Sequence, residues 1–111
     1  MLQRPVFPLR RFNSRVETPD GVWVFWSCDG RDEISQVRDL SLGGLFVETP
    51  RPRAVGATTT LDFLVHEGQI RADAVVRHIS PGHGVGLRFT AVRDGDRSHL
   101  AALFNRLNRS S

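Results

Sequence analysis

The sequence predicts a mainly β protein, an antiparallel barrel or sandwich that ends in one helix. Short runs of β-branched and aromatic residues recur at close spacing, separated by turns that contain Gly, Pro and Asp. Near the C-terminus the apolar period changes to that of an amphipathic helix. With 111 residues, 40% of them hydrophobic, the chain has the size of one domain, so we expect a single domain over residues 1–111.

Prolines and turn signals define the first elements. Pro5 and Pro8 disfavour a helix, so we expect residues 1–14 to form a flexible, extended arm. A short strand beginning at residue 15 ends at a Pro-Asp-Gly turn. The run VWVFWSC follows at residues 22–28, with β-forming side chains at almost every position. Because both faces of this strand are apolar, we expect both to be covered.

Five more strand-like segments and a helix complete the chain. The segments are EISQVRDLS, LFVET after a Gly-Gly break, TTTLDFLVH, IRADAVVRHIS and GVGLRFTAV. The barrel or sandwich is therefore expected within residues 15–90. A spacing of i, i+3, i+4, i+7 predicts an amphipathic helix over residues 94–109, which Asp94 or Asp96 can cap. The positions that carry this spacing are Leu100, Leu103, Phe104 and Leu107.

The composition argues against several classes of protein. All 15 basic residues are arginine, but the net charge is only +3. The single cysteine, Cys28, excludes an internal disulfide framework and a cysteine-based zinc site. No apolar run approaches the length of a membrane-spanning helix, and the N-terminal residues lack the apolar core of a signal peptide. We therefore expect a soluble, cytoplasmic protein without a cofactor or metal.

Arginines gather where the arm meets the first strand. Arg11 and Arg15 are four residues apart, and Arg10 directly precedes them. A guanidinium group binds phosphate oxygens through two parallel hydrogen bonds, and it also recognises the edge and the face of guanine. Two such groups suit a compact ligand with several negative charges. The alternative is that both arginines form surface ion pairs with Glu17 or Asp20.

A second group of candidate residues follows in a strand and turn. Asp39, Ser41 and Gly44 form a D-x-S-x-x-G pattern, and strand alternation places Asp39 and Ser41 on one face. A carboxylate accepts hydrogen bonds from groups such as guanine N–H, and a hydroxyl both donates and accepts. A glycine lets a flat ring approach the backbone. The alternative is a bulge or turn at Gly43-Gly44 that the polar side chains tie down locally.

The two patterns together resemble the PilZ domain family. An R-x-x-x-R pattern precedes a first strand, and D-x-S-x-x-G follows in a strand pair. The segments ADAVVRHIS and GVGLRF and a short amphipathic helix then agree with the end of such domains, so that the resemblance covers about residues 10–108. The resemblance implies a six-stranded antiparallel β-barrel with a C-terminal α-helix. It also implies a bacterial receptor for cyclic di-GMP, a ring dinucleotide with two guanines and two phosphates.

The resemblance implies a role for each motif. The arginine pair would hold phosphate and guanine from the arm, and the D-x-S-x-x-G residues would contact a guanine and the phosphate ring on the barrel surface. An arginine at position 10 implies binding of a stacked ligand dimer. We expect the arm to fold over the ligand and so alter the surface that a partner meets. The expected ligand-binding residues are Arg11, Arg15, Asp39, Ser41 and Gly44, with Arg10 and Gly43 as additional contacts.

The expected function is that of a stand-alone receptor that relays cyclic di-GMP to an unidentified effector protein, as a monomer or weak homodimer. The family resemblance implies a process such as motility or biofilm regulation. An enzyme is not expected, because the four histidines form no HxxxH or HExxH pair and GHGVGL fails the dinucleotide-binding pattern. Two alternatives stay open. One is a PilZ adaptor that binds no nucleotide, and the other is a small basic barrel that stacks RNA bases on Trp23, Phe25 and Trp26.

Overall fold

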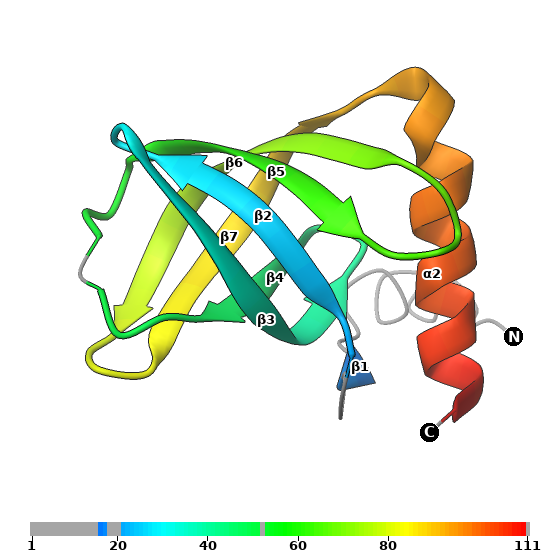
Figure 1. Cartoon of the computed structure of the whole chain (residues 1–111), viewed down its shortest axis with the longest axis horizontal. Coiled ribbons are helices and arrows are strands. Elements are labelled where there is room, and N and C mark those ends of the chain that lie inside the picture. Colours follow the sequence, from blue (N-terminus) through cyan, green and yellow to red (C-terminus); the bar gives the residue numbers. More distant parts are fainter. Residues whose placement is uncertain (1–15, 18–20, 52, 111) are drawn as a thin grey trace, which may run out of the picture.

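The computed structural model describes residues 16–17, 21–51 and 53–110, and Figure 1 shows their strands rolled into a barrel with a helix at one end. The strands are β1 (Val16–Glu17), β2 (Trp23–Cys28), β3 (Arg31–Ser41), β4 (Gly44–Glu48), β5 (Thr58–Leu64), β6 (Ile70–Ser80) and β7 (Gly84–Val92). They are followed by a short 3-10 turn, η1 (Asp94–Asp96), and the helix α2 (Arg97–Ser110).

Six strands close the barrel. They pair in the order β3-β2-β5-β6-β7-β4, all antiparallel, and β4 pairs back with β3. The two-residue β1 lies along β3 beyond the start of β2, with Val16 opposite Leu40 and Glu17 opposite Asp39. The expected six-stranded antiparallel barrel with a C-terminal helix is confirmed, and the sandwich that the strand pattern also allowed is excluded.

Alternation along β2 divides its apolar side chains between the core and the outer wall. Val24 and Trp26 are fully buried inside the barrel, whereas Trp23 and Phe25 on the outer face are 43% and 39% exposed. The expectation that both faces of this strand are covered is therefore wrong for the outer face. The physical reason is the position of α2, which lies against one end of the barrel and not against the β2 wall (Figure 1).

Helix α2 closes its end of the barrel with the apolar stripe that the spacing predicts. Leu100, Leu103, Phe104 and Leu107 are all buried and belong to the same core as the inward-facing strand residues. The helix begins at Arg97, three residues later than expected, because residues 94–96 form the 3-10 turn. The Asp96 carboxylate accepts a hydrogen bond from the backbone N–H of Arg71 at 2.9 Å, and so it ties the start of the helix to β6.

An ion pair fixes the second half of α2 to the β5–β6 turn. Arg106 donates hydrogen bonds to the Glu67 carboxylate from both Nε and Nη2. The Glu67 side chain is only 7% exposed, so the pair is shielded from water on the carboxylate side. Hydrogen bonding from Arg106 lowers the pKa of Glu67 below its ordinary value, against the opposite effect of burial.

A hydrogen-bonded cluster fills the barrel near its other end. Trp26 Nε1 donates to Ser35 Oγ (2.9 Å), and the Ser35 hydroxyl donates to the Glu33 carboxylate (3.1 Å). Arg53 donates to the same carboxylate at 2.8 Å, while its guanidinium lies 4.7 Å from the centre of the Trp26 ring. The neighbouring Cys28 thiol is buried, which raises its pKa above the ordinary value of 9.0. This cysteine therefore stays a neutral thiol at physiological pH and packs as a small core residue.

The β4–β7 pairing requires a glycine at position 44. Gly44 lies opposite Arg88 on β7, and a Cβ added to it would stand 2.1 Å from the carbonyl oxygen of Leu87. A contact of that length forces the two backbones apart. At Gly43, in contrast, an added Cβ would meet only Ser41 Oγ, at an ordinary 3.9 Å.

We predict that the two glycines respond differently to alanine. Gly44→Ala should lower the free energy of unfolding by roughly 3 kcal/mol, because β4 must move away from β7. Gly43→Ala should change it by less than about 1 kcal/mol, since the turn has room for a methyl group. Urea denaturation monitored by tryptophan fluorescence measures both, and equal stability of the two variants would contradict the packing argument.

We also predict that the Glu67–Arg106 pair makes the fold sensitive to acid. The pKa of Glu67 is lower in the folded than in the unfolded protein, so its ionised form stabilises the fold above the ordinary value of 4.5. That contribution is lost as the pH falls through the lower, folded pKa. Glu67→Gln should therefore be less stable at neutral pH and lose less stability between about pH 6 and pH 3 than the wild type. Urea unfolding across this range tests the expectation, and an equal loss of stability in Glu67→Gln and the wild type would contradict it.

Candidate functional site

Ser41 and two glycines build the hairpin between β3 and β4. Ser41 lies opposite Gly44 across a two-residue turn, Leu42-Gly43. Ser41 Oγ accepts hydrogen bonds from the N–H groups of Gly43 (3.2 Å) and Gly44 (3.1 Å) and donates to the Gly44 carbonyl oxygen at 3.3 Å. The local arrangement that the sequence left open as an alternative is therefore present. Ser41 is buried, and its hydroxyl fixes the shape of the turn.

A bulge in β3 directs Arg38 and Asp39 toward the same surface. The register with β4 shifts between Val37 and Asp39, which leaves Arg38 as the extra residue. The Arg38 guanidinium lies 4.4 Å from the centre of the Phe46 ring and 3.6 Å from the Glu48 carboxylate. Leu40 is fully buried, so Asp39 and Ser41 on either side of it share the outer face, as alternation predicted.

The wall beside the hairpin is flat because β7 carries glycines there. Asp39, Phe46, Gly86 and His78 stand opposite one another across four neighbouring strands. The Phe46 and His78 rings lie with their centres 5.9 Å apart, tilted by 34°. A Cβ on Gly86 would overlap the His78 ring at 2.1 Å, so a side chain there would displace the imidazole. Gly86, the third glycine of GHGVGL, is thus explained by the close packing of the His78 ring on the barrel surface.

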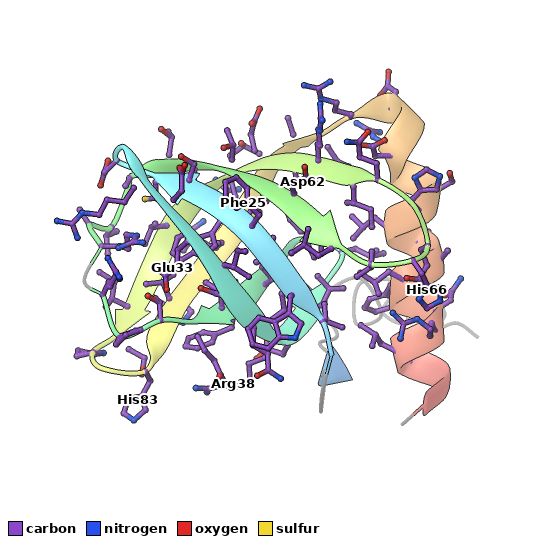
Figure 2. The ribbon with its side chains drawn as sticks, viewed as in Figure 1. Phe25, Glu33, Arg38, Asp62, His66 and His83 are labelled. Carbon is purple, nitrogen blue, oxygen red and sulfur yellow. The ribbon has the colours of Figure 1, made fainter. Side chains whose placement is uncertain are left out.

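The paired residues just described form one row across the outer wall. A second outward-facing row lies two residues further along the strands, closer to α2. Ser41 lies opposite Gly44, which in turn lies opposite the exposed Arg88 on β7. Gly44 itself is buried, and it separates the turn from Arg88 without a side chain of its own. The two rows, with the neighbouring Arg38, present a carboxylate, two guanidinium groups and two rings. Figure 2 shows Arg38 along the lower side of the barrel, outside the closed wall.

Arg10, Arg11 and Arg15 lie outside the described residues, so their side chains are not placed. The first described residue is Val16, which follows Arg15 in the sequence and pairs with Leu40 of β3. Since β1 runs antiparallel to β3, its N-terminal end is the end nearest Ser41. The pairing therefore places Val16, the first described residue after the R-x-x-x-R pattern, beside the D-x-S-x-x-G residues.

Sequence reasoning missed four of the residues on this surface: Arg38, Phe46, His78 and Arg88. Strand alternation alone would have placed Arg88 on the outer face. Alternation also places Arg38 outward, because it follows the buried Val37. The bulge instead decides that Asp39, the next residue, faces outward as well. In the described part of the chain, no group of three or more His, Cys, Asp or Glu side chains could hold a metal ion. No described helix is long and apolar enough to cross a membrane.

Comparison with known proteins agrees with this geometry. The chain resembles the structure of MrkH from K. pneumonia in its apo state, with a TM-score of 0.69 and 18% sequence identity over 87% of this chain and 50% of that one. It also resembles the PlzA protein of Borreliella burgdorferi, described in complex with c-di-GMP, with a TM-score of 0.59 and 16% identity over 86% of this chain and 41% of that one. The chain thus spans half or less of the length of each.

No curated protein matches the chain at a significant level. The family model for the PilZ domain matches residues 9–106, a range that contains both arginines of the R-x-x-x-R pattern, the D-x-S-x-x-G hairpin, the whole barrel and most of α2. With this match over nearly the whole chain, and with the closed barrel and its terminal helix, the protein belongs to the PilZ domain family.

Proposed function

We propose that this protein binds cyclic di-GMP on the outer wall around the β3–β4 hairpin and acts as a receptor that signals to a protein partner. The observation that carries the proposal is the pairing of β1 with β3. Val16, the residue that follows the R-x-x-x-R pattern, lies opposite Leu40, between Asp39 and Ser41. We infer from this that the arginines reach the D-x-S-x-x-G residues. A relative of the same fold, PlzA, is described in complex with this ligand.

The charges of the wall suit the ligand. Cyclic di-GMP carries two phosphate charges, and guanidinium groups bind phosphate oxygens in a bidentate geometry. Arg11 and Arg15 would supply this from the arm. The exposed Arg88, opposite Gly44, adds a further positive charge. Arg38 is held over Phe46 by its ring contact and lies 3.6 Å from the Glu48 carboxylate, which partly balances its charge.

Each hairpin residue has a different task in this proposal. The half-buried Asp39 carboxylate would accept hydrogen bonds from guanine N–H groups. Ser41 would act mainly through the turn, because its hydroxyl holds the N–H groups of Gly43 and Gly44 in place. Gly44 leaves the wall without a side chain, so that a flat ring can lie against the backbone. We regard residues 1–14 as the arm that closes over the ligand.

Binding of the ligand must also be passed on to a partner. We propose that ligand binding is read by another protein. Ordering of the arm over the ligand would change the surface beside β1 and α2, and an effector could recognise that change. We propose that the protein works in this way in the cytoplasm, as a monomer or weak homodimer, in a process such as motility or biofilm regulation.

Calorimetric titration with cyclic di-GMP tests the binding. We expect Arg11→Ala, Arg15→Ala and Asp39→Ala each to weaken affinity by about ten- to a hundredfold, the usual effect of losing a charged hydrogen bond. Arg31→Ala removes an exposed arginine at the far end of β3 and should bind like the wild type. Circular dichroism should show the wild-type fold in all four. If the wild type binds no cyclic di-GMP, the family's adaptor role without nucleotide is the better explanation.

The titration also gives the stoichiometry. If Arg10 contributes to a stacked ligand dimer, the wild type should take up two molecules per chain and Arg10→Ala only one. One molecule per chain in both proteins would remove this role from Arg10 and leave the single-ligand site intact.

A further inference from the structure

The first half of β3 has one backbone edge that no described strand pairs with. β3 runs from Arg31 to Ser41, but its ladder with β4 covers only Val37 to Ser41. Beyond Val47, β4 leaves β3 and follows β7, with Glu48 opposite Gly84 and Thr49 N–H bonded to the His83 carbonyl. The barrel is therefore open along a seam at this point.

The register shows which backbone groups face the seam. Val37 donates its N–H to the Val22 carbonyl oxygen at 2.8 Å, so this pair is a hydrogen-bonded one. Hydrogen-bonded and non-hydrogen-bonded pairs alternate along an antiparallel ladder, and Ser35 is thus also bonded to β2. The N–H and C=O groups of Ile34 and Gln36 consequently point away from β2, into the seam. Among the described residues they have no strand beside them.

The seam is a groove with apolar and acidic sides. It has a volume of about 350 Å³. Ile34 and Gln36 line one side of it, and Glu48, Thr49 and His83 line the other. Figure 2 shows His83 on the lower side of the barrel, the same side as Arg38.

Exposed apolar side chains continue from the groove onto the wall. Ile34 is 58% exposed, and Trp23, also half-exposed, lies across from Gln36 at the same groove. Phe25 stands directly opposite Ile34, and Leu64 directly opposite Trp23, so all four large side chains form one patch outside the barrel. Scattered apolar residues need no explanation, but a contiguous patch beside an open strand edge marks a surface for another chain.

We propose that an extended segment of a partner protein adds to the edge of β3 at Ile34 and Gln36, with apolar side chains on Trp23 and Ile34 and a basic side chain near Glu48. Strand addition satisfies the free backbone groups and takes its affinity from main-chain hydrogen bonds. The charged side chains that line the groove, Glu33 and Glu48, are both carboxylates. Glu33 is held by the buried Arg53, whereas Glu48 is half-exposed and 3.6 Å from Arg38, which leaves it open to a second cation.

The same charges argue against other occupants. Carboxylates at the groove, with Asp32 and Asp62 beside the patch, repel the phosphates of a nucleic acid. This weighs against RNA stacking on Trp23 and Phe25. The surface lies at the opposite end of β3 from the hairpin, so the proposal does not depend on nucleotide binding.

Amide hydrogen exchange measured by NMR tests this directly. The probe is an acetylated and amidated peptide, Arg-Ser-Val-Ser-Val, at millimolar concentration, and strand alternation puts its arginine and both valines on one face. Its control is the same peptide with every backbone nitrogen methylated, which keeps the side chains and the charge and has no backbone N–H donors. We expect the unmethylated peptide alone to slow exchange at Ile34 and Gln36 by about tenfold or more. Unchanged exchange at both amides, or equal slowing by the methylated peptide, would overturn the proposal.

A pair of variants provides an independent check. Ile34→Pro removes one donor that faces the groove, and it is compatible with the fold because that N–H does not pair with β2. Ile34→Thr keeps the donor. Peptide-dependent slowing at Gln36 should be lost in the proline variant and retained in the threonine variant, with unfolding curves confirming that both are folded. Slowing that appears without peptide, simply on raising the protein concentration, would assign the edge to a second copy of the chain and reject the proposed partner.

Discussion

The pairing of β3 with three other strands is the constraint on which the rest of the structure depends. β2 and β1 share one edge of β3, and β4 takes part of the other. The bulge after Val37 makes this possible, because it bends the strand and changes the face of the residues that follow. The nucleotide site proposed above and the open seam therefore lie at opposite ends of one strand.

Much of the fold could be predicted from the sequence because the local signals agree with one another. Asp29 and Gly30 have positive φ angles of 54° and 77°, and their D-G pair turns β2 into β3. Alternation placed Val24 and Trp26 together, and both are buried. The stripe of α2 was found by its period, and its four residues enter the core. These are interactions between near neighbours in the chain, which a single sequence records well.

The rest depends on contacts between distant residues. The exposed Trp23 and Phe25 carry the same apolar signal as buried Trp26, and only the position of α2 decides which face is covered. Gly44 was expected to make room for a ligand. The structure shows a different reason for a glycine at this position, the close approach of the Leu87 carbonyl, which the spacing of the motif does not reveal. The bulge at Arg38 likewise depends on how β4 pairs with β3. The places of Asp39 and Ser41 on one face were predicted correctly, whereas the side chains of the arm lie outside the described residues.

The glycines of β7 have a consequence for the thermodynamics of any ligand on this wall. Because Gly86 lets the His78 ring lie flat and Gly84 does the same for Phe46, both rings are wedged against backbone. Phe46 is also enclosed by the Arg38 guanidinium. A side chain that packing already restrains loses little rotational freedom when another molecule covers it, and of the two rings Phe46 is the buried one. The wall is thus a preorganised surface, and the entropic penalty of association would fall mainly on whatever segment closes over it.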